Sequence, residues 1–205
     1  MARAKWVGRV QHRQAPLDVF VGRAAERGQL AEVVARVEAG QPWLVAIEGD
    51  PGVGKTALVR RCLAETAGLR VLQARANLPE ADLDFGIVDQ LLRPAGEAVL
   101  TAETSAPTSS FAVGARLLEV VGEQLATGAL AIVIDDLQWV DRKSAEALTF
   151  MLRRLSVDPV LAIMTYRGPG DLLDEPAQRM LASVENRHGL VTGADHLGGQ
   201  RVQDG

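Results

Sequence analysis

The chain has 205 residues, of which 47% are hydrophobic and 23% are charged, and its formal net charge is -4. These values are typical of one soluble globular domain, and the negative charge gives no overall attraction to nucleic acid or to an anionic membrane. No stretch approaches the roughly 18 consecutive apolar residues of a membrane span. The single cysteine, Cys62, cannot form an internal disulfide, so we expect a protein of the reducing cytoplasm.

The chain begins with a polar segment, followed by a helix pattern and a strand pattern. We interpret residues 1–19 as a loose basic leader. Apolar residues then recur at the spacing of one helix face from Leu30 to Val37, and Gly40 ends this predicted helix. Residues 43–48 form a short apolar run, which is typical of a strand buried in a parallel sheet.

The loop at residues 49–56 fits the phosphate-loop pattern, in which a glycine and four further residues precede Gly-Lys-Ser/Thr. Glycines suit this loop because several backbone N–H groups must approach a β-phosphate closely. Lys55 supplies charge for the β- and γ-phosphates, and the Thr56 hydroxyl is a ligand for Mg²⁺. An ordinary glycine-rich turn is the alternative, but a strand before the loop and an amphipathic helix after it favour phosphate binding. The candidate residues are Gly49, Asp50, Pro51, Gly52, Val53, Gly54, Lys55 and Thr56.

The middle of the chain predicts further elements of an α/β fold. A second strand is expected at residues 69–74, a helix at residues 85–92 and an exposed loop at residues 101–110. Residues 111–126 carry the apolar face of another helix.

A continuous apolar run at residues 130–134 ends in two carboxylates, Asp135 and Asp136. In an open α/β sheet, ligands bind at the carboxyl ends of the strands, so these carboxylates are expected at the same edge as the phosphate loop. Asp135 is therefore predicted to hold Mg²⁺, and Asp136 to orient or deprotonate the attacking water. The alternative is that the pair only caps a turn.

The next strand pattern also ends in a charged residue. A helix is expected after Asp141, with Asp141 or Ser144 as its N-cap. Residues 159–164 then form an apolar strand that leads to Arg167. Its place at the same sheet edge suggests a contact with the γ-phosphate, and a surface arginine is the alternative.

The end of the chain carries weaker patterns. Residues 176–184 predict a short helix, and we place the end of the folded domain, residues 20–187, just beyond it. Residues 188–205 are interpreted as a poorly ordered tail, in which residues 190–191 are the best candidate for a strand. Neither asparagine of the chain stands in a guanine-reading motif, so ATP is the expected nucleotide.

Four motifs follow one another in a characteristic order: Phe-Val-Gly-Arg at residues 20–23, the phosphate loop, Asp-Asp-Leu-Gln-Trp-Val-Asp at residues 135–141 and Thr-Tyr-Arg at residues 165–167. In this order the chain resembles the nucleotide-binding domain of large bacterial LuxR-type (MalT-like) transcriptional regulators. These regulators belong to the STAND class of signal-transduction ATPases, which are relatives of the AAA+ and Orc-like ATPases. The resemblance spans about residues 18–185.

The resemblance also implies roles for single residues. An acidic residue commonly follows Val-Gly-Arg, whereas this chain has Ala24 there and Glu26 two positions further on. The implied roles are an adenine pocket for Val21, Gly22 and Arg23, magnesium binding for Asp135, catalysis for Asp136 and γ-phosphate sensing for Arg167.

The expected fold is an α/β P-loop NTPase of the ASCE or AAA-like type, a three-layer sandwich with a mostly parallel sheet flanked by helices. The helical lid and the DNA-binding helix-turn-helix of such regulators have no counterpart in the sequence, so we expect a truncated form that binds no nucleic acid or membrane directly. The predicted function is a Mg-ATP-binding signalling module with slow ATP hydrolysis, and nucleotide-dependent self-association is a further hypothesis. The alternatives are a non-hydrolysing nucleotide-binding or interaction module, a truncated remnant, and a small-molecule kinase.

Overall fold

The computed structural model describes residues 23–66, 68–95, 109–155, 157–168, 173–185 and 189–193. The predicted leader, the adenine-pocket residues Val21 and Gly22, and most of the loop predicted at residues 101–110 lie outside the described residues.

Five parallel strands form one sheet in the order β2-β3-β4-β1-β5. Because β4 lies between β1 and β3, one strand separates the strand before the phosphate loop from the strand that leads to the two aspartates. This arrangement confirms the predicted α/β class with a parallel sheet. The strands are β1 (Trp43–Glu48), β2 (Arg70–Arg75), β3 (Leu130–Asp135), β4 (Val160–Tyr166) and β5 (Gly189–Gly193).

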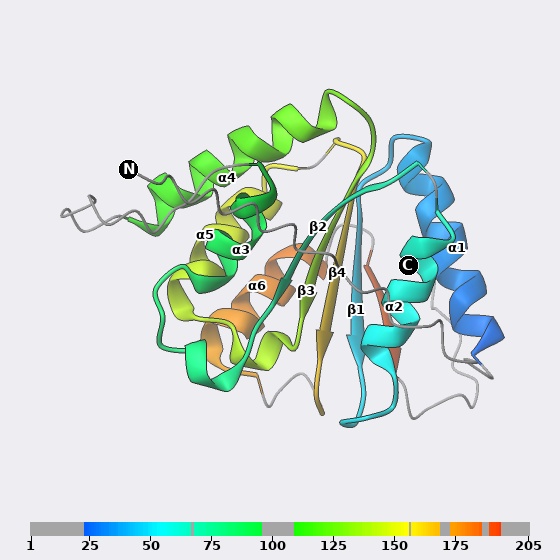
Figure 1. The fold of residues 1–205 in the computed structure, drawn as a ribbon, viewed down its shortest axis with the longest axis horizontal. Helices are drawn as coiled ribbons and strands as arrows, with labels where there is room; N and C mark the ends of the chain where they lie inside the picture. The colour runs from blue at the N-terminus through cyan, green and yellow to red at the C-terminus, as the bar shows by residue number, and fades with distance from the viewer. Residues whose placement is uncertain are drawn as a thin grey trace, which may run out of the picture.

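Helices cover both faces of the sheet (Figure 1), and alternating strand residues pack against each layer. Val45 and Ile47 face the core under α1 and α2, whereas Leu44 and Ala46 face the core under the other helices. The central strands are therefore apolar at nearly every position, as their sequences predict. The helices are α1 (Ala24–Glu38), α2 (Lys55–Ala64), α3 (Gly86–Leu92), α4 (Ser110–Leu125), α5 (Arg142–Leu152) and α6 (Glu175–Glu185), and the short 3-10 helices are η1 (Leu78–Glu80), η2 (Arg93–Ala95) and η3 (Leu137–Trp139).

The last strand, β5, contains residues 190–191, the best strand candidate that the sequence analysis found in this segment. β5 pairs with β1 from Leu44↔Gly189 to Glu48↔Gly193, so the sheet continues beyond the domain end expected at residue 187. The strand contains only five residues and has a glycine at each end, so its side chains give little of the pattern by which strands are recognised. Its backbone pairing with β1 places it in the sheet.

Two further expectations concern α5 and membrane spans. Of the two N-cap candidates of α5, Asp141 is the cap, because its side chain accepts a hydrogen bond of 2.8 Å from the Ser144 backbone N–H. Within the described residues, every helix is too short or too polar to cross a membrane.

Candidate functional site

The phosphate loop connects β1 to α2 with the backbone conformations that glycine allows. Gly52 has φ 83° and Gly54, the N-cap of α2, has φ 87°, a region that residues with a Cβ atom rarely adopt. The loop therefore leads directly into a helix whose first N–H groups have no partners within the helix. Such a helix start is suited to bind an anion.

Lys55, the first residue of α2, is 7% exposed and turns back to its own loop. Its Nζ donates hydrogen bonds to the carbonyl oxygens of Gly49 at 2.6 Å and Asp50 at 3.0 Å. The charge of Lys55 is thus held inside the loop that is predicted to receive the phosphates.

Thr56 and Asp135 are 79 positions apart in sequence and meet at the carboxyl edge of the sheet. The Thr56 hydroxyl lies 3.0 Å from Asp135 Oδ1 and 2.8 Å from Oδ2, and Thr165 also donates to Asp135 Oδ1. Asp135 is 2% exposed, and the hydrogen bonds from these two hydroxyls fix the orientation of its carboxylate. One carboxylate and one hydroxyl next to a phosphate loop form the donor set that Mg²⁺ takes when phosphate oxygens and water complete its shell, so these residues fit the metal.

Asp136 follows β3 in a left-handed backbone conformation, with φ 61° and ψ 46°, and its carboxylate is held on both oxygens. Arg75 Nη2 lies 3.0 Å from Oδ2, while Gln138 Nε2 and Arg167 Nε lie 3.0 Å and 3.2 Å from Oδ1. Burial raises the pKa of Asp136, but hydrogen bonds from Gln138 and Arg75 and the charge of Arg167 outweigh burial and hold the pKa below its ordinary value. Asp136 therefore stays ionised and binds protons weakly.

The start of α1 reaches the phosphate loop through Arg23. This residue has φ 62° and ψ 34°, and its guanidinium donates a hydrogen bond to the Val53 carbonyl in the loop. Its Nε also lies 3.9 Å from Oε1 of Glu26 in the first turn of α1. Of the three residues of the predicted adenine pocket the structure describes Arg23, and Arg23 contacts the predicted phosphate loop.

A family model described as an AAA ATPase domain matches residues 19–163 of the chain. The chain belongs to the AAA ATPase domain family. Among solved structures, the AAA ATPase domain is similar to a chain in the structure of Drosophila ORC bound to DNA, with a TM-score of 0.53 and 18% identity. The similarity covers 85% of this chain and 42% of the ORC chain, so this chain spans less than half of the length of the ORC chain. At 18% identity the similarity shows the fold alone. No curated protein matches the chain.

The AAA ATPase domain brings together most of the residues that the sequence singled out. Lys55, Thr56 and Asp135 lie in one connected group, and Arg167 joins it through Asp136. Family membership confirms the P-loop, AAA-like assignment, whereas the role of each residue stays a prediction.

The sequence analysis did not predict a role for two residues of the site, Arg75 and Gln138. Arg75 ends β2, pairs in register with Asp135 and keeps 61% of its side chain exposed while it contacts Asp136. Gln138 donates to Asp136 and accepts a hydrogen bond of 3.1 Å from the Arg167 backbone N–H. The only sequence signal for Arg75 was its place directly after the strand predicted at residues 69–74, and Asp135 and Arg167 likewise follow predicted strands.

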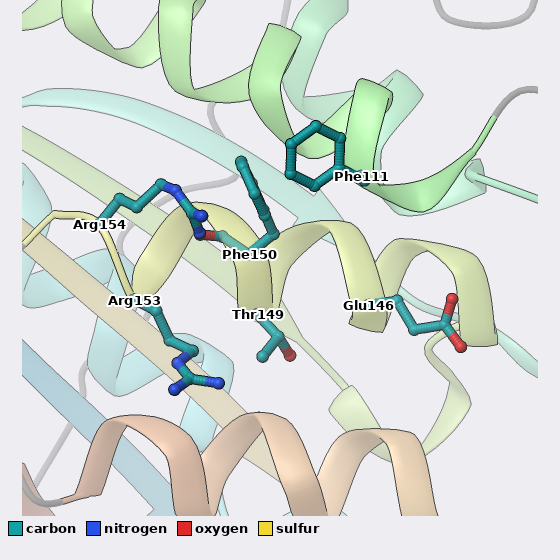
Figure 2. A pocket seen from close by; sticks show the side chains of 6 residues that line it. All are labelled: Phe111, Glu146, Thr149, Phe150, Arg153 and Arg154. Atoms are coloured by element: carbon teal, nitrogen blue, oxygen red, sulfur yellow. The ribbon is translucent and has the colours of Figure 1, made fainter.

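A separate surface pocket lies on α4 and α5 (Figure 2). The rings of Phe111 and Phe150 meet edge to face with centroids 4.5 Å apart, and the Arg154 guanidinium lies 3.4 Å from the Phe150 ring centroid. The pocket contains no residue of the phosphate loop, and its lining consists of Phe111, Glu146, Thr149, Phe150, Arg153 and Arg154.

Proposed function

We propose that this AAA ATPase domain binds Mg-ATP and acts as a nucleotide switch with slow ATP hydrolysis, as part of a transcriptional regulator of the LuxR type. The observation that carries the proposal is the contact between Asp135 and Thr56, the residue that follows Lys55, at 2.8–3.0 Å. A strand-end carboxylate, a hydroxyl and a loop lysine meet where a triphosphate would place its β- and γ-phosphates. The four ordered motifs support the regulator assignment.

Each side chain has a definite task in this proposal. Lys55 moves from its loop carbonyls to the phosphate oxygens, which are stronger acceptors because they are charged. Thr56 and Asp135 hold Mg²⁺, which when bound neutralises part of the phosphate charge. Arg167 contacts the γ-phosphate, and this contact distinguishes ATP from ADP.

Slow hydrolysis follows from the surroundings of Asp136. A general base works best when its pKa lies near the working pH, whereas the pKa of Asp136 is lowered by the groups that hold it. Both of its oxygens are also occupied, by Arg75 on one side and by Gln138 and Arg167 on the other. The same observation favours the second candidate function, a domain that binds ATP and does not hydrolyse it.

Thermal unfolding with Mg-ATP, Mg-ADP or Mg-GTP tests nucleotide binding. A ligand that binds only the folded state adds about 2.7 kcal/mol of stability at one hundred times its dissociation constant. We expect adenine nucleotides to stabilise the wild type and Lys55→Ala to lose this effect. Arg60→Ala, an exposed change on the same helix, is the matched control and should respond as wild type does. A folded wild type that no nucleotide stabilises would contradict the proposal.

Phosphate release then separates the two candidate functions. The switch with slow hydrolysis predicts that Asp136→Asn lowers the rate while nucleotide stabilisation remains. Equal rates in wild type and Asp136→Asn would exclude a catalytic role for Asp136 and leave the non-hydrolysing module.

A further inference from the structure

The surface pocket on α4 and α5, here called the α4–α5 pocket, exposes an aromatic ring that the proposed nucleotide chemistry does not use. The pocket has a volume of about 680 Å³. The Phe111 ring is 64% exposed and packs edge to face against Phe150. Exposed aromatic surface is unfavourable in water, and rigid aromatic side chains are frequent anchors of protein interfaces. The ring pair is therefore a candidate contact for a partner.

Arg154 presents an oriented positive group beside the rings. Its guanidinium lies over the Phe150 ring and donates a hydrogen bond of 2.9 Å to the Phe150 carbonyl oxygen. Among the described residues Arg154 has no ion-pair partner, so most of its five N–H donors are available to a ligand. A stacked guanidinium is suited to bind a carboxylate through two parallel hydrogen bonds. Arg153, the preceding residue, adds a second positive charge to the lining.

Glu146, the acidic residue of the lining, has partners of its own. Figure 2 shows Glu146 at one end of the labelled group and Arg154 at the other. The Glu146 carboxylate accepts hydrogen bonds from the Ser110 hydroxyl at 2.8 Å and from Arg142 Nε at 3.1 Å. These hydrogen bonds hold the pKa of Glu146 below its ordinary value. Glu146 thus stays ionised at its own end and leaves the Arg154 end positive.

We infer that the α4–α5 pocket binds an amphipathic helix of a partner protein, which presents an acidic residue three or four positions from a leucine or an aromatic residue. The apolar side chain contacts the rings of Phe111 and Phe150, and the carboxylate accepts hydrogen bonds from Arg154. The spacing follows from the 3.4 Å between the Arg154 guanidinium and the Phe150 ring centroid, because residues three or four apart on a helix are neighbours on its surface.

Charge and shape favour a peptide over two other ligands. A nucleic acid carries a phosphate at every nucleotide, so a strand that crosses the pocket also passes the ionised Glu146, whereas a peptide carries acid only where the pocket is positive. A small molecule needs a site that covers most of its surface. This lining comes from neighbouring helices and leaves Phe111, Glu146, Arg153 and Arg154 exposed.

A displayed library of helical peptides with random residues on one face, selected for binding to the full chain, tests the chemistry of the partner. We expect the bound peptides to share an acidic residue three or four positions from a leucine or an aromatic residue. Selection of peptides without this pair would overturn the inference, and so would the absence of any enrichment over a selection without protein.

Fluorescence anisotropy with the tightest selected peptide tests the place of binding. Arg154→Gln should weaken binding about ten- to hundredfold, the effect of losing a hydrogen bond to a charged group. Phe111→Ala should weaken it about tenfold or more, as removal of an aromatic anchor does. Arg60→Gln, the same exposed change on α2 across the sheet, is the matched control and should bind as wild type does. Equal binding by wild type and Arg154→Gln would refute the inference.

Charge reversal gives a result that a loss of folding cannot imitate. Arg154→Glu should bind the selected peptide weakly, and should bind a peptide with lysine in place of its acidic residue more tightly than wild type does. If Arg154→Glu shows no preference for the lysine peptide, the inference fails.

Two further measurements test the other occupants of the pocket. A single-stranded oligonucleotide that binds wild type but not Arg154→Gln would assign the pocket to nucleic acid. A dimer in sedimentation that Phe111→Ala dissociates would assign it to a second copy of this chain. Either result would overturn the inference and leave the proposed nucleotide binding untouched, because the lining contains no residue of the phosphate loop.

Discussion

Replacing Thr56 by valine tests the predicted metal pair, because the substitution removes one hydroxyl and keeps the shape of the side chain. That hydroxyl lies 3.0 Å and 2.8 Å from the two Asp135 oxygens, and a hydrogen bond to a charged group contributes about 1.5–3 kcal/mol. Thr56 is only partly buried, so water can replace part of the lost bond, and Asp135 keeps the bond from Thr165. We expect a loss of about 1–2 kcal/mol, which lowers Tm by about 2–8 °C in a domain of this size.

Urea unfolding measures this loss, and ATP titrations with and without Mg²⁺ measure the metal effect. Thr66→Val is the matched control, because the Thr66 hydroxyl donates only to the neutral Cys62 carbonyl, at 3.0 Å, beyond the far end of α2. The control should lose about 0.5–1.5 kcal/mol and keep the magnesium dependence of ATP binding. Thr56→Val should lose that dependence. If Mg²⁺ strengthens ATP binding to Thr56→Val as much as to wild type, the assignment of Thr56 to the metal is refuted.

Three further predictions concern stability. The lowered pKa of Asp136 means that its ionised form stabilises the fold above the unfolded-state pKa of about 3.9, and that this contribution is lost as the pH falls through the lower folded-state pKa. Asp136→Asn should therefore show a smaller fall in Tm across that acid range, and an unchanged profile would contradict this. Asp141 caps α5 and accepts from two backbone N–H groups around the start of α3, so Asp141→Ala should cost about 2–4 kcal/mol in urea unfolding. A Cβ atom on Gly114 would lie 2.8 Å from the Ala147 carbonyl oxygen, so Gly114→Ala should lose about 1–3 kcal/mol, whereas Gly122→Ala, on an open stretch of the same helix, should be neutral or stabilising.

The central sheet could be predicted from sequence because its strands are buried on both faces. β1, β3 and β4 each appear as a continuous apolar run, since one set of residues packs under α1 and α2 and the alternate set packs under the other helices. β5 could not be predicted with the same certainty. It is held through backbone pairing with β1, and pairing between distant segments leaves no local pattern in a five-residue strand between glycines.

The candidate site could also be predicted only in part from the sequence. The phosphate loop, Asp135 and Arg167 could be placed at one edge because each follows an apolar strand, and parallel strands end at the same edge of a sheet. Arg75 was missed because its importance depends on which strand lies beside β3. The pairing of β2 with β3 puts Arg75 in register with Asp135, and no local pattern around residue 75 contains that information.

The polar side chains predicted to meet Mg-ATP already have partners within the chain. Lys55 donates to loop carbonyls, Thr56 to Asp135, and Arg167 to Asp136. In the proposed mechanism Lys55 and Arg167 exchange these contacts for stronger ones with charged phosphate oxygens, and Thr56 exchanges its contact for Mg²⁺. In the proposed mechanism only ATP changes the contact between Arg167 and Asp136. A γ-phosphate draws Arg167 away, which removes one of the charges that keep the pKa of Asp136 low, whereas ADP leaves the contact in place. The unequal response to ATP and ADP is what a nucleotide switch requires, because a ligand shifts a conformational equilibrium only when it binds the two states differently.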